Sequence, residues 1–91
     1  MTHAIVLIRA ERTAMADVGP ALAEVEGVTE AYSVTGEWDF VAVVRVREHG
    51  RLAELVTGRL SKLPGITKTQ TMVAFEVYSR HDLEALFAVG G

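Results

Sequence analysis

The sequence repeats itself, and this repeat limits the possible folds more than any other feature of the chain. When the sequence is shifted by 38 positions, residues 25–29 (VEGVT) align with residues 63–67 (LPGIT), and Ile5 aligns with Val43. Each copy reads as an apolar strand, a helix, a glycine corner and a second strand. Two copies are too few for a solenoid. Two βαβ units joined by a hairpin instead predict a ferredoxin-like βαββαβ sandwich of the α+β class.

The local patterns agree with this order of elements. Residues 4–10 and 40–46 are short runs rich in β-branched side chains, which favours strands. Leucine and valine recur at spacings of three and four between Leu52 and Leu63, which predicts the second helix. The second strand is predicted over residues 28–35. The last strand is predicted to be long, over residues 66–78.

The boundaries of the helices are less clear than their existence. If the first helix starts near Thr13, Pro20 lies inside it and removes one backbone hydrogen bond. If the regular helix starts near Gly19, Pro20 occupies the first turn, where proline is tolerated. The sequence does not decide between the two. Gly27 and Gly65 lie just past the two helices, where a left-handed residue is needed.

The length of 91 residues predicts one domain over residues 1–91, with a core at about 3–78 and a tail at 79–91. Leu83, Leu86 and Phe87 share one helical face, so we expect a short C-terminal helix in this tail. The net charge is −3 and the nine basic residues are scattered, so direct binding to nucleic acid is not expected. The N-terminus has no basic region before its apolar run, so we expect neither a signal peptide nor a membrane span, and a cytoplasmic location.

The strands predict a dimer. In residues 4–8 both alternating sets of side chains are apolar, and residues 41–46 repeat the pattern. One face of the sheet meets the two helices, and the other face would leave large aliphatic side chains in water. We therefore expect two sheets to face each other in a symmetric dimer, as in a dimeric α/β barrel.

Catalytic and metal sites are not indicated. No nucleophile motif, phosphate-binding loop or dinucleotide-binding motif is present, and no paired histidines have metal-ligand spacing. The chain has no cysteine, so it has no thiolate ligand. We therefore expect no enzyme activity, no catalytic residues, no metal and no cofactor.

Two segments could bind a ligand, although each has an ordinary structural explanation. The loop between the second and third strands contains Thr35, Gly36, Trp38 and Asp39. It is either a simple hairpin with a locally bonded aspartate, or a loop whose backbone lets a ligand approach Gly36. Three threonines, Thr67, Thr69 and Thr71, share one face of the last strand. Threonine is common in strands, but three hydroxyls beside an oligomer seam could hold a polar small molecule.

Taken together, these segments resemble a known family. The order of elements, the segment at residues 32–40 (YSVTGEWDF) and the segment at residues 63–71 (LPGITKTQT) look like the effector-binding module of Lrp/AsnC-type transcription regulators, also called the RAM domain. The resemblance covers about residues 3–78. It implies a dimer of ferredoxin-like subunits that assembles further into octamer-like rings. It also implies that amino acids or related metabolites bind at the seam between dimers.

Carried over residue by residue, the resemblance gives Gly36, Asp39, Thr69 and Thr71 as ligand contacts, with Thr35 and Trp38 as secondary candidates. The sequence starts at the first strand, so we expect a stand-alone member that lacks a helix-turn-helix segment. Such a member would either co-assemble with a full-length regulator or only bind a metabolite.

Two alternative functions remain open. One is a small enzyme of the dimeric α/β-barrel type, such as a monooxygenase or isomerase. This would need a polar pocket between helices and sheet, where the patterns place mainly aliphatic residues and Tyr32 is the chief exception. The other is a purely structural partner that remodels the oligomer of another regulator.

Overall fold

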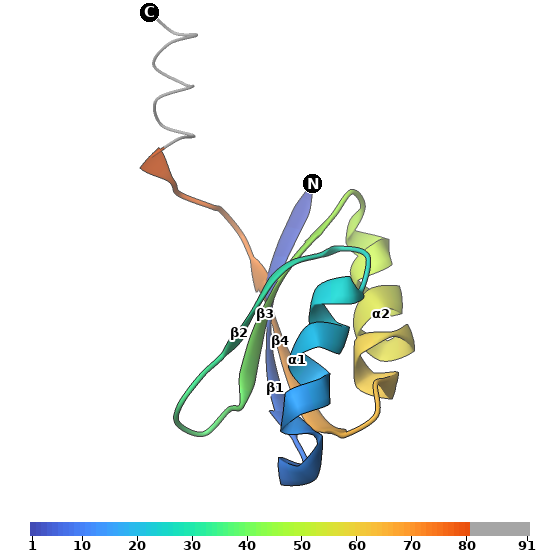
Figure 1. Ribbon diagram of the computed structural model, residues 1–91. Helices are drawn as coiled ribbons and strands as arrows, with labels where there is room; N and C mark the ends of the chain where they lie inside the picture. The colour runs from blue at the N-terminus through green and yellow to red at the C-terminus, as the bar shows by residue number, and fades with distance from the viewer. Residues whose placement is uncertain (81–91) are drawn as a thin grey trace, which may run out of the picture.

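Two helices cover one face of a four-stranded antiparallel sheet in the computed structural model, which describes residues 1–80 (Figure 1). The sheet order is β2-β3-β1-β4, which confirms the ferredoxin-like βαββαβ fold. The elements, in chain order, are β1 (Thr2–Ala10), η1 (Arg12–Ala14), α1 (Met15–Glu24), β2 (Val28–Ser33), β3 (Phe40–Val46), α2 (His49–Gly58), η2 (Leu60–Lys62) and β4 (Ile66–Ala74). The predicted C-terminal helix lies outside the described residues.

The core lies between the sheet and the helices, and the two central strands supply most of its sheet side. Alternate residues of β1 and β3 point at the helices because side chains alternate across a strand. The buried residues are Ala4, Val6, Ile8, Val18, Leu22, Val25, Phe40, Ala42, Val44, Leu52, Leu55 and Leu60. All are apolar, so no buried charge or hydroxyl within residues 1–80 needs a hydrogen-bond partner there. The apolar helix faces predicted from the spacing of leucine and valine are therefore the faces that pack on the sheet.

The last strand is shorter than predicted. It ends at Ala74, where residues up to 78 were expected. The reason is that β4 pairs only with β1, and the register ends where His3 meets Ala74. Beyond this point only Thr2 remains in β1, so the strand offers almost no further partner for the ladder hydrogen bonds. Residues 75–80 leave the sheet, and Phe75 is fully exposed (101%).

Two other boundaries also differ from the sequence prediction, and the structure decides between the two interpretations of Pro20. β2 ends at Ser33, two residues early, because the hairpin begins at Val34. Pro20 lies inside α1, so the interpretation in which the helix includes this proline is correct, and the start near Gly19 is wrong. The second helix ends at Gly58 and continues as the separate short helix η2.

The corner before β4 lies very close to η1. Gly65 has a φ of 93° and accepts a hydrogen bond from the Glu11 amide at 2.8 Å. A Cβ atom at this position would lie 2.3 Å from the Cβ of Ala14. Only glycine therefore satisfies both the left-handed backbone and the close approach of η1.

We predict that Gly65→Ala lowers the free energy of unfolding by about 2–4 kcal/mol, because it adds both an overlap and backbone strain. Gly58→Ala is the matched control. Nothing lies within 4 Å of a Cβ at Gly58, which ends α2, so alanine there should be neutral or stabilising by up to about 1 kcal/mol. Urea denaturation followed by circular dichroism measures both. Equal effects of the two substitutions would contradict the proposed role of this corner.

Candidate functional site

The hairpin between β2 and β3 is fastened to the end of β1 rather than standing free. Within the hairpin, the Val34 amide donates to the Asp39 carbonyl at 3.0 Å. The Asp39 amide donates to the Ile8 carbonyl at 2.9 Å, and the Asp39 carboxylate accepts from the Ala10 amide at 2.9 Å. Asp39 therefore bonds an amide as its residue type suggested, but the amide belongs to β1 and not to the loop.

Gly36 forms the exposed tip of this hairpin. Its φ is 105°, and no atom lies within 4 Å of where a Cβ would be. The glycine is therefore required by the backbone conformation and not by crowding. The space above Gly36 is open, and Thr35 beside it is also exposed. Thr35 and Gly36 are accessible to a molecule that approaches from outside the subunit.

Trp38 lies between two cationic side chains. The Arg9 guanidinium and the Lys68 ammonium are each 5.5 Å from the centre of the indole ring. Arg9 also donates to the Glu37 carbonyl at 3.0 Å and pairs with the Glu37 carboxylate at 3.2 Å. Cation–π contacts at exposed positions contribute about 0.5–1 kcal/mol each. These contacts hold the indole against β1 and β4.

Thr69 and Thr71 lie on the other face of the sheet from Trp38. They pair with Ile8 and Val6, whose side chains point at the helices. Arg9 and Lys68, which flank Trp38, form the adjacent pair on the opposite face. Thr71 also lines a groove of about 320 Å³ against α2. Within one subunit, Thr35, Gly36, Trp38 and Asp39 therefore lie in one loop. Thr69 and Thr71 lie on the helix side of the edge strand β4.

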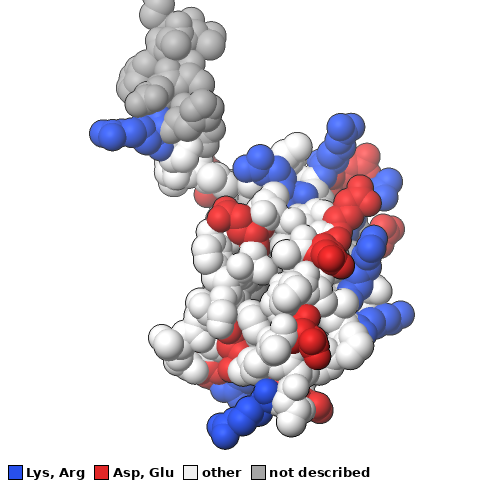
Figure 2. Space-filling view, viewed as in Figure 1, with Lys and Arg blue, Asp and Glu red and all other residues white. Residues whose placement is uncertain are grey.

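The centre of the sheet face opposite the helices is apolar, with polar side chains such as Arg45, Lys68 and Gln70 around it. The strand registers place on it Ile5, Leu7, Tyr32, Val41, Val43 and Met72. Ile5 is 38% exposed although it belongs to a central strand. In Figure 2 the charged side chains gather toward α2, and the part nearer β2 and β3 is mostly uncharged. We refer to these six residues as the open face.

Tyr32 is the one open-face residue whose acid–base behaviour is altered. Its hydroxyl donates to the carboxylate of Glu30, which raises the pKa of Tyr32 above its usual value of 10. The same arrangement recurs at Tyr78 and Glu76, and it raises the pKa of Tyr78. Both phenols therefore remain protonated at neutral pH and act as hydrogen-bond donors.

A second polar region lies at the other end of the sheet. Four arginines surround a hollow of about 830 Å³ between β3 and α2. None of them was among the candidate residues from the sequence. For Arg51 and Arg59 the sequence signal is their spacing of four on either side of Leu55; Arg51 lies on α2, and Arg59 caps its C-terminal end. Within residues 1–80 no group of three or more histidine, aspartate or glutamate side chains could hold a metal ion.

Comparisons with known proteins place this fold in a class of small regulatory ligand-binding domains. The family model of the Lrp/AsnC ligand binding domain matches residues 3–83. An uncharacterized HTH-type transcriptional regulator of Pyrococcus furiosus is 34% identical over 77 residues, which are 81% of this chain and 51% of that protein. The leucine-responsive regulatory protein of Haemophilus influenzae is 28% identical over 72 residues, 79% of this chain and 43% of that protein.

Solved structures give the same result. The protein TTHA0845 from Thermus thermophilus has a TM-score of 0.81 and 41% identity, and the match covers 88% of this chain and all of that one. AsnC of E. coli has a TM-score of 0.78 at 19% identity, covering 86% of this chain and 53% of that one. The chain belongs to the Lrp/AsnC ligand-binding domain family. It spans about half the length of the curated relatives it matches. Within residues 1–80 no helix is long and apolar enough to cross a membrane.

We predict that Asp39→Ala lowers the free energy of unfolding by about 1–3 kcal/mol, because the part-buried Ala10 amide loses its acceptor. Asp39→Asn keeps an acceptor oxygen and should cost less. Thr35→Ala, an exposed change in the same hairpin, serves as the control. Urea denaturation monitored by the fluorescence of Trp38, the single tryptophan, measures all three. If Thr35→Ala destabilises as much as Asp39→Ala, the Ala10 contact does not fasten the hairpin.

Proposed function

We propose that this domain dimerises through its open face and binds an amino acid or a related small metabolite at an interface between subunits. The observation that carries the proposal is the apolar open face in a member of a ligand-binding family. A monomer would keep this face in water, and contiguous apolar surface of this kind usually marks an interface. Phe75, fully exposed just beyond β4, adds to the apolar surface that a partner would cover.

The candidate ligand contacts fit a site shared between subunits. Thr35 and Gly36 face outward at one end of the sheet, while Thr69 and Thr71 lie on the helix side of the edge strand β4. A single small molecule cannot easily touch both sets within one subunit, because the sheet separates them. One ligand could touch both sets if they came from two different subunits. A seam between subunits in a larger, octamer-like ring would bring the two sets together.

The choice of an amino acid rests on relatives. One curated relative is named as leucine-responsive. A structural neighbour from Neisseria meningitidis is described as a complex with L-Met, although at 15% identity that likeness concerns the fold alone. Because the relatives are transcriptional regulators, a regulator is the natural partner through which ligand binding here would act on transcription.

An enzyme on the same fold is a weaker proposal. A catalytic pocket between helices and sheet needs polar side chains that reach the substrate. The residues buried there are all apolar within residues 1–80, and Tyr32 lies on the opposite face. No observation in this part of the chain therefore favours the enzyme over the binding domain.

We predict that Ile5→Lys with Met72→Lys converts the oligomer to smaller species, because two ammonium groups would be buried without partners. Both residues are partly exposed in the subunit, so the change should not prevent folding. Ala23→Lys, on the exposed side of α1, is the control and should leave the assembly intact. Light scattering at micromolar concentration measures the mass. A wild-type protein that is already a monomer would refute the proposed dimer.

We also predict that one of the standard amino acids stabilises the protein in a thermal-shift screen. A ligand at about one hundred times its dissociation constant adds about 2.7 kcal/mol to the free energy of unfolding. Thr69→Val with Thr71→Val removes two hydroxyls at nearly constant volume and should abolish this gain. Thr13→Val, on the exposed helix η1, should preserve it. If no amino acid shifts the transition, the proposed ligand class is wrong.

A further inference from the structure

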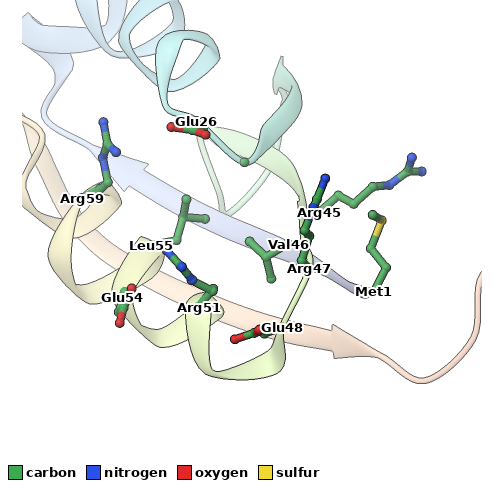
Figure 3. Close-up of a pocket in the computed structure, with 11 residues that line it drawn as sticks. Met1, Glu26, Arg45, Val46, Arg47, Glu48, Arg51, Glu54, Leu55 and Arg59 are labelled. Atoms are coloured by element: carbon green, nitrogen blue, oxygen red, sulfur yellow. The ribbon is translucent and has the colours of Figure 1, made fainter.

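The arginine hollow lies at the opposite end of the sheet from the hairpin. The hollow lies near the end of the sheet where Val46 of β3 pairs with Thr2. The hairpin lies beyond the other end, where Phe40 pairs with Ile8. Figure 3 shows arginine and glutamate side chains around the hollow, with Leu55 and Val46 between them. Its volume of about 830 Å³ is within the range of small-molecule sites. Because the hollow and the hairpin lie at opposite ends of the sheet, the hollow is separate from the ligand contacts proposed above.

The backbone around Gly27 shapes the floor of the hollow. Gly27 has a φ of 101°, and a Cβ there would lie 3.0 Å from the Leu55 side chain and 3.6 Å from Val46. The Gly27 carbonyl accepts a hydrogen bond from the Arg45 amide at 2.8 Å. The corner that contains Glu26 is thus fixed close to both β3 and α2. An added methyl group would press against Leu55, so the left-handed backbone and this close packing both favour glycine here.

The charges around this floor are concentrated but not paired with each other. Arg45, Arg47, Arg51 and Arg59 line the hollow, four of the nine basic residues in a chain of net charge −3. Within residues 1–80, the only ion pair closer than 4.0 Å is the distant Arg9–Glu37 pair. Each guanidinium offers up to five donors. The hollow therefore presents many donors that no carboxylate of the described residues has engaged.

Two of these arginines are held at a defined spacing. Arg51 and Arg59 lie four residues before and after Leu55, and the Arg59 amide bonds the Leu55 carbonyl at 3.1 Å. Arg51 lies in the first turn of α2 and Arg59 caps its C-terminus, so the two cations line the hollow from opposite ends of the helix. An occupant with two anionic groups can contact both guanidinium groups at once. Bidentate contact with phosphate or carboxylate is the strongest interaction that arginine makes.

We propose that this hollow binds a small metabolite with at least two phosphate or carboxylate groups, and that Arg51 and Arg59 hold those groups from either side of Leu55. The lining also includes Glu26, Glu48 and Glu54. These carboxylates can accept hydrogen bonds from amino or hydroxyl groups of the same ligand. They would repel an extended polyanion such as a nucleic-acid backbone, so the proposal is confined to small molecules.

The test uses inorganic pyrophosphate and citrate as probes, in thermal shift and titration calorimetry on the full chain at low ionic strength. At about ten times its dissociation constant, a probe should raise the melting temperature by about 5–10 °C. Arg51→Gln and Arg59→Gln should each weaken binding about fivefold or more. The relative affinities of the two probes distinguish phosphate from carboxylate recognition.

Three controls make the outcome decisive. Arg12→Gln and Lys62→Gln each remove one positive charge away from the hollow and should leave binding unchanged. Glu26→Gln should strengthen binding about threefold, because it removes a carboxylate that faces the anion. The proposal is overturned if neither probe binds, or if Arg12→Gln weakens binding as much as Arg51→Gln. It is also overturned if only a duplex oligonucleotide binds, with the same dependence on Arg51 and Arg59.

Discussion

The pairing of β1 with two neighbours is the interaction on which the rest of the structure depends. β1 hydrogen-bonds β3 on one side and β4 on the other, so it joins the two halves of the repeat. Val6 and Ile8 on one side of the strand pack under the helices, while Ile5 and Leu7 form the centre of the open face. Backbone groups at its end also hold the hairpin. One apolar strand thus specifies the core, the open face and the position of the loop.

The sequence was sufficient for the topology because the topology depends on patterns that occur twice. Period-two strands, period-three-to-four helices and a glycine corner recur in both halves, and each copy supports the interpretation of the other. The length of the last strand could not be predicted in the same way. Alternation continues through Val77, but pairing stops at Ala74, opposite His3, where only Thr2 of β1 remains. Strand length is set by the partner, and the partner is remote in sequence.

In the candidate site too, the sequence predicted what depends on single residues but not what depends on contacts with distant segments. The sequence correctly indicated that Gly36 needs a permissive backbone and that Asp39 bonds an amide. It could not indicate that the amide is that of Ala10, 29 positions away along the chain. Nor could it indicate that Thr69 and Trp38 lie on opposite faces, because that depends on the register of β4 against β1. Registers arise from packing of the whole sheet and not from the residues of one segment.

The two ends of the sheet differ in chemistry, and the fold explains why both can be used. At the hairpin end, the charged groups of Arg9 and Glu37 are paired with each other, and the loop offers mainly backbone and hydroxyl groups. At the other end, the arginines lie unpaired around Leu55 and Val46. Val46 points toward the helices because it shares its face with Val44. A partner sheet on the open face would cover Arg45, which shares that face with Val43, but it would leave the floor at Val46 and Leu55 and the two arginines beside Leu55 uncovered, so dimerisation and anion binding can occur on the same subunit.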